Sequence, residues 1–579
     1  IDMSTGKICC LVLLTLGVLA VVVVLVVILT QPNCGSQRYL HGAVAADTET
    51  CSVIGRYVHR PLGFSGHMLC LSWIQRDRQV HVLTTGVHRV SVLSPLLRVS
   101  SRTVEVINAR ETVPQRFPHD LLSGCTAGLP VGKDTAMRAV CAPGVRCTKL
   151  RVGEVRTLLT LSEVLFNCLH SSGMIFAKVR KNTSSLEFLP LICDDQGFLK
   201  HGDTFRWPAL QKTLKAVAEN GAAAFYEGQI GKALVEDIRK AGSTISLEDL
   251  QAYRADVSSA LNITLNNHTT VFSPGPPMGG AVLLFILKIL EVYKLHEASL
   301  ATPKEKVETY HRIAEALKFG NMLKPHMSDP AFSKSQVTVR TVLSDKIAEL
   351  ARSRIDDRGD HPLNYYNLLE SIYNHGYKSK GTSHISVLAA DGSAVSATST
   401  INYPFGSFVY SNQTGIILNN ELADFCIANR NIEPGEHSHP QNKTQDQELD
   451  IQAIYNWAGT KPPSAMVPSI LISKTGDMLV IGGAGGGWII SATAMAIINK
   501  LWLGYDLEHA ISAPIMHTEG NNTLFEEHFS EEVRSSLLGR GHKEGEAIFA
   551  MNVVQGISKE GKCISAYSDK RKLGKSAGY

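Results

Sequence analysis

Two neighbouring segments about two-thirds of the way along the chain, residues 382–387 and 396–402, have the pattern of a β-hairpin rich in hydroxyl side chains. In the first, Thr382, His384 and Ser386 alternate with the intervening residues at the period of two expected of a strand. Between the segments, Asp391 followed by Gly392 is a tight-turn signal that folds the second strand back beside the first. This pairing sets Thr382 opposite Thr400, so the sequence predicts a sheet that carries a candidate nucleophile.

Length and charge bound the rest of the chain. With 579 residues, 44% of them hydrophobic, it can bury a large core, and length alone predicts roughly three to four domains or fewer large ones. A net charge of +4 from 57 basic and 53 acidic residues, without a clustered basic stripe, argues against a nucleic-acid partner.

The N-terminus carries a membrane segment. Residues 8–30 are uncharged and rich in Leu and Val, long enough to cross a hydrocarbon core of roughly 30 Å as a helix. A cleaved signal peptide would have a shorter apolar region and a small-residue cleavage site, so we favour a retained signal anchor after a cytoplasmic tail at 1–7. Cys9 and Cys10 within this segment are either acylated or simply apolar residues without a special role.

Possible glycan sites set the orientation, because the charge bias across the segment, with Lys7 before it and Arg38 after it, is weak. Six Asn-x-Ser/Thr acceptors follow the membrane segment and favour a lumenal or extracellular body, hence a single-pass type II protein of the cell membrane. They are Asn182, Asn262, Asn267, Asn412, Asn442 and Asn521. Twelve cysteines fit an oxidising compartment but are too sparse for a disulfide-built fold.

From about residue 205 the chain reads as alternating helices and strands. The pattern predicts helices at 207–219 and 233–241, a capped helix start at Ser246, and a helix at 279–287 buried nearly all round. Residues 429–450 are polar and read as a long surface loop or lid. His437 and His439 in that loop could hold a metal ion, but no further ligand pattern accompanies them, so no metal site is predicted.

Near the C-terminus, a strand at 478–481 runs into six residues of which five are glycine, and a helix follows at 489–501. Such a turn gathers backbone N–H groups at a helix N-terminus, which suits a carboxylate, a phosphate or a developing oxyanion. It lacks the Lys-Ser/Thr of a P-loop and the dinucleotide-binding spacing. Close packing of helix on strand is the alternative reading.

Taken together, these segments resemble the gamma-glutamyltransferases, also called glutathione hydrolases. The likeness rests on 382–387, on 391–402 with Phe405 and Gly406, on 415–421, on 462–464, on the glycine turn, and on 568–572 with the ending 576–579. Within the family, 355–361 and 467–472 are most similar to the type 5, leukotriene-processing branch.

The resemblance implies an N-terminal-nucleophile hydrolase with a four-layer α/β/β/α fold, made as a proenzyme that cuts itself between Gly381 and Thr382. The large subunit would be 31–381 and the small catalytic subunit 382–579. Glycine before the nucleophile allows the strained backbone that self-attack needs. The new α-amine of Thr382 would be the general base for its own hydroxyl.

The resemblance also implies a role for each matched residue. Thr400 would orient Thr382, and Gly485 and Gly486 would offer N–H groups to the oxyanion. Arg110 would grip the substrate α-carboxylate, with Ser464 adding a contact. Glu421 and Asp424 would hold the α-ammonium, assisted by Asn402. Without the resemblance, Thr382 would be an ordinary structural residue of a strand and Arg110 would form an ion pair at the surface. Glu421 and Asp424 would then lie on a solvated face of a helix or loop.

The implied reaction is attack on the γ-glutamyl amide of glutathione or a glutathione conjugate, with a γ-glutamyl ester on Thr382 that water or an acceptor amino acid or dipeptide releases. No cofactor or metal is implied. Two rivals stay open: a non-catalytic, unprocessed membrane glycoprotein, and an N-terminal-nucleophile amidase for another acyl group.

Some segments depart from the family pattern. Ala465 stands where the family usually has a second serine, and Gly487 and Trp488 are also unusual. Residues 56–102 lack the expected early helix and glycine-rich approach to a core strand, and about 132–181 match poorly. A misread frame or unusual exon is one explanation, and genuine divergence is the other.

Overall fold

The computed structural model describes most of the chain after residue 37. The described residues are 38–58, 87–91, 103–116, 193–194, 197–198, 206–332, 339–369, 382–402, 406–407, 409–425, 459–545 and 552–579. The predicted membrane segment at 8–30, the cleavage-site residue Gly381 and the histidine-containing loop at 429–450 lie outside them.

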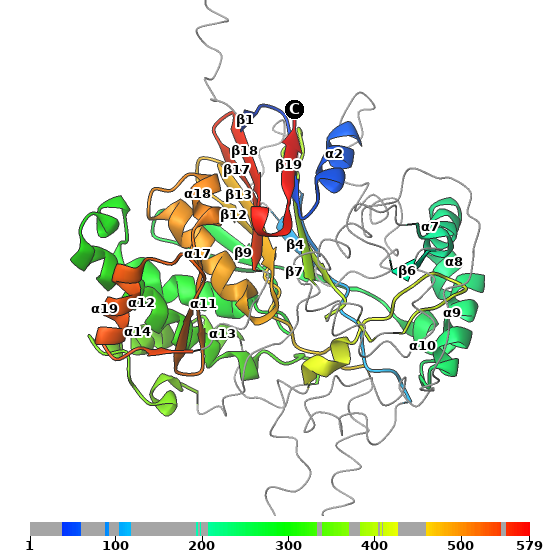
Figure 1. Cartoon of the computed structure of the whole chain (residues 1–579), viewed down its shortest axis with the longest axis horizontal. Helices are drawn as coiled ribbons and strands as arrows, with labels where there is room; N and C mark the ends of the chain where they lie inside the picture. Colours follow the sequence, from blue (N-terminus) through cyan, green and yellow to red (C-terminus); the bar gives the residue numbers. More distant parts are fainter. Residues whose placement is uncertain are drawn as a thin grey trace, which may run out of the picture.

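Two seven-stranded sheets lie face to face at the centre of the molecule (Figure 1). In order across the first sheet, the strands are β1 Arg38–Tyr39, β18 Cys563–Ser568, β17 Val553–Glu560, β13 Met478–Ala484, β12 Ser469–Ile472, β9 Thr270–Ser273 and β8 Leu261–Thr264. Across the second sheet they are β19 Lys575–Gly578, β2 Ala43–Ala46, β10 Thr382–Leu388, β11 Ala394–Thr400, β3 Val87–Ser91, β4 Thr103–Asn108 and β7 Asp256–Ser259.

The helices that follow β9, among them α11 and α17, lie on the outer side of the first sheet, and α2 packs on the second sheet against β2 and β19 (Figure 1). Helices α7–α10 form a separate group on the opposite side of the molecule. The helices are α2 Glu49–Val58, α7 Pro208–Asn220, α8 Ala223–Tyr226, α9 Gln229–Lys240, α10 Leu247–Ala252, α11 Gly280–Leu290, α12 Pro303–Asn321, α13 Val339–Val342, α14 Asp345–Ser353, α17 Ile489–Leu501, α18 Leu507–Ser512 and α19 Glu531–Gly539. Smaller sheets join β14 Met516–Glu519, β15 Asn522–Phe525 and β16 Lys543–Glu544, and β5 Cys193–Asp194 with β6 Gly197–Phe198. This succession of helices, sheet, sheet and helix is of the mixed α/β class expected from the sequence.

The predicted hairpin is present as β10 and β11. The strands pair antiparallel from Thr382 opposite Thr400 to Leu388 opposite Ala394, and the turn between them holds Gly392 at φ +83°. Both strands pack on the first sheet, where Ser386 donates to the backbone oxygen of Gln555. Gly482 of β13 lies against His384 so closely that a Cβ there would come within 2.3 Å of the imidazole. This contact between sheets needs a glycine in β13.

The main core lies between the first sheet and its helices. Helix α11 is buried at every residue except Lys288, as the unbroken apolar run at 279–287 predicts. Helix α17 is buried from Ile489 to Asn499. Helix α11 packs on β8 and β9, and α17 packs on β13, the strand that runs into the glycine turn.

Other local predictions agree in kind and differ in their bounds. The expected helix at 207–219 is α7, one residue later at each end. Helix α9 begins four residues before the expected 233 because Gly228 is its N-cap. Ser246 caps α10 in a reciprocal capping box with Asp249.

The atypical region still contributes a central strand. Val87–Ser91 forms β3, which pairs with β11 on one side and with β4 on the other. The sequence showed no expected approach to a core strand there, so this strand was missed. It has few of the β-branched, alternating side chains that mark a strand, and its place is set by its neighbours in the sheet.

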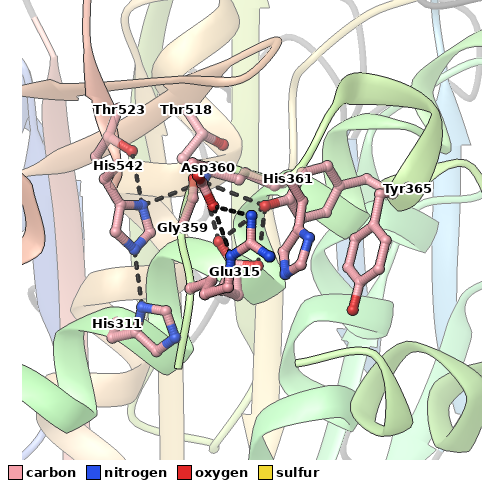
Figure 2. Close-up of polar contacts among 12 residues, drawn as sticks. His311, Glu315, Gly359, Asp360, His361, Tyr365, Thr518, Thr523 and His542 are labelled. Carbon is pink, nitrogen blue, oxygen red and sulfur yellow. Dashed lines mark hydrogen bonds and ion pairs between the residues drawn. The ribbon is translucent and has the colours of Figure 1, made fainter. Parts of the chain in front are cut away.

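A buried network of polar side chains connects α12 to the segment directly after α19 (Figure 2). His311 Nδ1 lies 2.8 Å from His542 Nε2, and Lys318 Nζ lies 3.1 Å from His542 Nδ1. Lys318 also donates to Glu315 at 2.9 Å and to the backbone oxygen of Gly359 at 2.9 Å. Since the lysine donates to Nδ1, His542 carries its proton on Nε2 and donates it to His311. The network joins residues on both sides of the expected cleavage bond.

Within the part of the chain that the structure describes, no helix combines the length and the apolar character needed to cross a bilayer.

Candidate active site

Thr382 is the first residue of β10 and is buried at the open end of the hairpin, away from its turn. Its hydroxyl donates to the hydroxyl of Thr400, with 3.2 Å between the two oxygens. The pairing register sets the two residues directly opposite each other, so the contact follows from the hairpin itself. The sequence therefore predicts the nucleophile candidate and its partner at the positions where the structure has them.

Asn402 connects this hairpin to a second polar group. Its backbone N–H donates to Thr400 Oγ1 at 2.8 Å, and its side-chain amide donates to Asp424 Oδ1 at 3.0 Å. Asn402 adopts φ +69°, a left-handed conformation that is uncommon outside glycine. Such backbone strain, of order 1–3 kcal/mol, persists where surrounding contacts enforce it and is concentrated at functional sites.

Arg110 is the centre of the second group and is fully buried. Its two terminal nitrogens donate to Glu421 at 2.5 Å and to Asp424 at 2.6 Å. Nε donates to the backbone oxygen of Pro462 at 2.9 Å, and Nη2 also donates to that of Pro463 at 2.8 Å. The guanidinium is thus held by ion pairs from η6 (Glu421–Asp424) and by carbonyls of the 459–465 segment.

The charges around Arg110 do not balance. Three carboxylates, those of Glu111, Glu421 and Asp424, lie within ion-pairing distance of one guanidinium. Burial raises the pKa of the Asp424 carboxyl well above its ordinary value, and Arg110 opposes this rise. The group therefore has an excess of acceptors over positive charge, which is suited to receiving a cation.

One carboxylate oxygen of this group is ready for such a cation. Glu421 is buried, and its Oε1 has no hydrogen-bond partner among the described residues, while Oε2 accepts from Arg110. An unpaired buried carboxylate oxygen is costly, so it marks a position where a ligand donor would be stabilising.

The hydrogen bonds of Arg110 within the protein restrict how it could bind a substrate α-carboxylate. Four of its five N–H groups already have protein acceptors, so a two-pronged grip on a substrate carboxylate requires one of the carboxylates to move away. Sequence alone could not foresee this, because each partner is distant along the chain.

Ser464 lies directly after the two prolines that accept from Arg110. It is buried, its N–H donates to the backbone oxygen of Pro277, and its hydroxyl accepts from the N–H of Met466 at 3.2 Å. The neighbouring Ala465 is buried in the core. Chain connectivity thus brings Ser464 to the Arg110 group.

The glycine turn follows β13, the strand that packs on β10. Gly485 has φ +125° and Gly486 has φ +63°, backbone conformations that favour glycine. A 3-10 helix at Gly486–Trp488 leads directly into α17. The glycine turn therefore lies at the start of a buried helix, the position that the sequence predicts for it. Trp488 stacks on His517 at 4.7 Å between ring centroids, which anchors the far end of the turn.

Sequence reasoning missed a buried charged group behind Thr382. Lys572 Nζ donates to the backbone oxygen of Thr382 at 2.5 Å and to Asp47 at 3.2 Å, and Asp47 also accepts from the side chain of Gln555. These residues come from opposite ends of the chain. The signal available was a lysine and an aspartate inside segments that match the family ending and beginning, without any indication that they meet.

Four of the six predicted glycan acceptors fall on described residues. Asn262, Asn267 and Asn412 are exposed, whereas Asn521 is half-buried. Asn182 and Asn442 lie outside the described residues.

Comparisons with known proteins identify the family of the chain. The sequence pattern of the gamma-glutamyltranspeptidase family matches residues 96–579. The glutathione hydrolase 5 proenzyme of Homo sapiens is 40% identical over 98% of each chain, and that of Rattus norvegicus is 39% identical over 98% of each. A solved structure, cephalosporin acylase from Bacillus halodurans, has the same fold with a TM-score of 0.67 and 16% identity, covering 95% of this chain and 99% of that one. The chain belongs to the gamma-glutamyltranspeptidase family.

Proposed function

We propose that this chain is a γ-glutamyl hydrolase and transpeptidase that acts on glutathione and glutathione S-conjugates after cutting itself before Thr382. Membership of the family makes hydrolysis or transfer of a γ-glutamyl group its chemistry. The glutathione hydrolase 5 proenzymes, similar over nearly the whole length, support glutathione as the donor and a processed precursor.

The observation that carries the proposal is one continuous set of hydrogen bonds. It runs from the Thr382 hydroxyl through Thr400 and Asn402 to Asp424 and Arg110. A nucleophile candidate is thereby fixed relative to a buried group of opposite charges. An α-amino acid end carries both charges, and an ordinary peptide bond carries neither.

In the proposed reaction, Thr382 Oγ bonds to the γ-carbonyl carbon while its proton passes to the free α-amine of the same residue. Negative charge develops on the former carbonyl oxygen, and N–H groups of Gly485 and Gly486 stabilise it there. The C–N bond then breaks, and the departing amine takes the proton from the α-ammonium. Water or an acceptor amine repeats the sequence on the γ-glutamyl ester and frees Thr382.

Donor binding would exchange ion pairs. The substrate α-ammonium binds the unpaired Oε1 of Glu421 and the carboxylate of Asp424. The guanidinium of Arg110, relieved of one carboxylate, pairs with the substrate α-carboxylate. Exchange of this kind avoids leaving a buried charge unpaired at any stage, which would cost several kcal/mol.

Substrates with a large group on the cysteine sulfur, including leukotriene conjugates, fit the same scheme. Only the γ-glutamyl end is read by charge, so the leaving part needs little specific contact. The similarity of 355–361 and 467–472 to the leukotriene-processing branch supports this extension.

The location proposed is the cell membrane, with residues 8–30 as a single-pass type II anchor and the catalytic body outside the cell. Exposed glycan acceptors at Asn262, Asn267 and Asn412 support it. Cys563 forms a disulfide, which suits an oxidising compartment.

Gel analysis of purified protein tests the proposal. Wild type should give two chains whose smaller one begins at Thr382, with release of glutamate from glutathione. Thr382→Ala should stay one uncut, inactive chain, and Thr382→Ser should recover both properties in part. A wild-type chain that stays uncut and inactive would reject the proposal and favour the non-catalytic glycoprotein.

A further inference from the structure

A buried lysine near the end of the chain contacts the backbone of the nucleophile. Lys572 ends η8 (Lys570–Lys572) and is 6% exposed. Its ammonium donates to the backbone oxygen of Thr382 at 2.5 Å and to Asp47 Oδ2 at 3.2 Å. The reaction described above assigns no role to this lysine, although burying an ammonium costs free energy unless it is compensated.

The position of Lys572 relative to the Thr382 nitrogen follows from covalent geometry. In any residue the backbone nitrogen and oxygen are about 2.7–3.6 Å apart. With Nζ 2.5 Å from the oxygen, the ammonium is within about 6 Å of the nitrogen, whatever the direction. After cleavage that nitrogen is an α-amine.

Few other described charges face this amine. Asp47 pairs with Lys572 itself, and His384, two residues along β10, has both ring nitrogens bonded to the hydroxyls of Thr398 and Ser386. The strands β2, β11 and β13 have no charged residue. The two charged residues of β17 are at its C-terminal end, which is less buried than the rest of the strand. On the substrate side, the charged residues are those of the Arg110 group: Arg110, Glu111, Glu421 and Asp424.

We propose that Lys572 is a positioning residue that fixes the main chain of Thr382 and keeps its α-amine uncharged. The inference rests on the proposed function, because only the cleaved chain has this amine. A positive charge within about 4–6 Å disfavours protonation of a neighbouring amine. The carboxylate of Asp47 pairs with the Lys572 ammonium and moderates the effect.

An uncharged amine is what the first step requires. The proton of the Thr382 hydroxyl goes to the lone pair of the amine nitrogen as Oγ bonds to the carbonyl carbon, and an amine that is already protonated cannot accept it. An ordinary α-amine has a pKa of about 7.7–8.0 and would be mostly charged at neutral pH. Lowering that pKa by one unit multiplies the active form about tenfold on the acid side.

The test is the pH dependence of kcat/KM with a chromogenic γ-glutamyl anilide, measured on processed enzyme between pH 5 and 10. Lys572→Gln should move the acid limb up by about one pH unit, so that kcat/KM falls about 10-fold at pH 6 and approaches wild type above pH 9. Lys572→Arg keeps the charge and should keep the wild-type limb.

A second variant predicts the opposite shift. Asp47→Asn leaves the charge of Lys572 without its carboxylate, so the acid limb should move down. This variant decides the question if Lys572→Gln does not mature. Lys570→Gln, on the same short helix but exposed and paired with Glu508, is the matched control and should leave the profile unchanged.

A lowering of kcat/KM by the same factor at every pH in Lys572→Gln would overturn the proposal and leave a purely structural lysine. So would an unshifted limb in both Lys572→Gln and Asp47→Asn. Failure of the proposed function is a separate result, since wild type would then be uncut or inactive before any variant is compared.

Discussion

The side-chain amide of Asn402 donates a hydrogen bond to Asp424 Oδ1 across 3.0 Å. Through its backbone N–H, the same residue contacts Thr400, and thereby the hydroxyl of Thr382. One asparagine thus holds the acyl-transfer end of the site against the end that would recognise the amino acid. It makes both contacts from a left-handed backbone conformation, at φ +69°.

Replacing this asparagine should separate the two ends. Asn402→Ala removes a hydrogen bond to a buried carboxylate, worth about 1.5–3 kcal/mol, so kcat/KM should fall by about 10- to 100-fold. Steady-state kinetics with a γ-glutamyl donor measure it. Asn402→Gly, which keeps the backbone conformation and lacks the amide, should fall equally. Normal kinetics in both variants would show that the Asp424 contact does not matter.

Removing the charge of Arg110 should destabilise the fold as well as abolish binding. Arg110→Gln leaves Glu421 and Asp424 buried without their cation, at a cost of about 3–5 kcal/mol. The urea unfolding midpoint should fall strongly, and Asp424→Asn added to Arg110→Gln should recover part of it. As a control, Lys240→Gln removes ion pairs made by an exposed lysine and should not move the midpoint. Equal midpoints for wild type and Arg110→Gln would contradict the account.

The histidine network predicts a loss of stability in acid (Figure 2). Burial, with Lys318 adjacent, lowers the pKa of His542 to about 2. The unfolded chain takes up that proton near pH 6.5, so the unfolded state binds more protons between these values. The contribution is full above pH 6.5 and is lost as the pH falls below it, by about 1.4 kcal/mol at pH 5.5.

Unfolding free energies at pH 7.5 and 5.5 test this effect. His542→Gln should lower stability at pH 7.5 and lose about 1.4 kcal/mol less than wild type on going to pH 5.5. His528→Gln, which changes an exposed histidine, should keep the wild-type pH dependence. A His542→Gln protein with the same pH dependence as wild type would show that this histidine is not the titrating group.

Glycan mapping tests the proposed extracellular location. Enzymatic release in heavy-oxygen water, followed by peptide mass spectrometry, should mark Asn262, Asn267 and Asn412 in protein from mammalian cells. Asn521 is half-buried and should carry little glycan. Thr264→Ala should remove the mark at Asn262 alone. The absence of glycan at all three exposed sites would count against a lumenal body.

Sequence reasoning reached the features that depend on local pattern. The period of two at 382–387 and the turn at Asp391 and Gly392 fix the β10–β11 hairpin and its register. The unbroken apolar run of α11 and the glycines after β13 are equally local signals. The site residues were named by resemblance, and the hydrogen bonds that join Arg110, Asn402, Glu421 and Asp424 show them in one place.

What the sequence did not reveal depends on contacts between distant residues. Asp47 and Lys572 are 525 residues apart and meet only because β2 and β10 are neighbours and β19 closes the same sheet. Strand β3 has no clear pattern of its own, and sheet neighbours set its place. The hydrogen bonds from Arg110 to two carboxylates and two carbonyls likewise have no signature along the chain.

The central claim is that Thr382 becomes a free N-terminal nucleophile that carries the γ-glutamyl group. Intact-mass spectrometry of purified enzyme, quenched in acid during turnover of a γ-glutamyl donor, tests it most directly. We expect a small subunit that, once deglycosylated, has the mass of residues 382–579, a fraction of it heavier by one γ-glutamyl group, and fragmentation that places the addition on Thr382. An adduct on another residue, or turnover by a chain still intact across 381–382, would contradict the account.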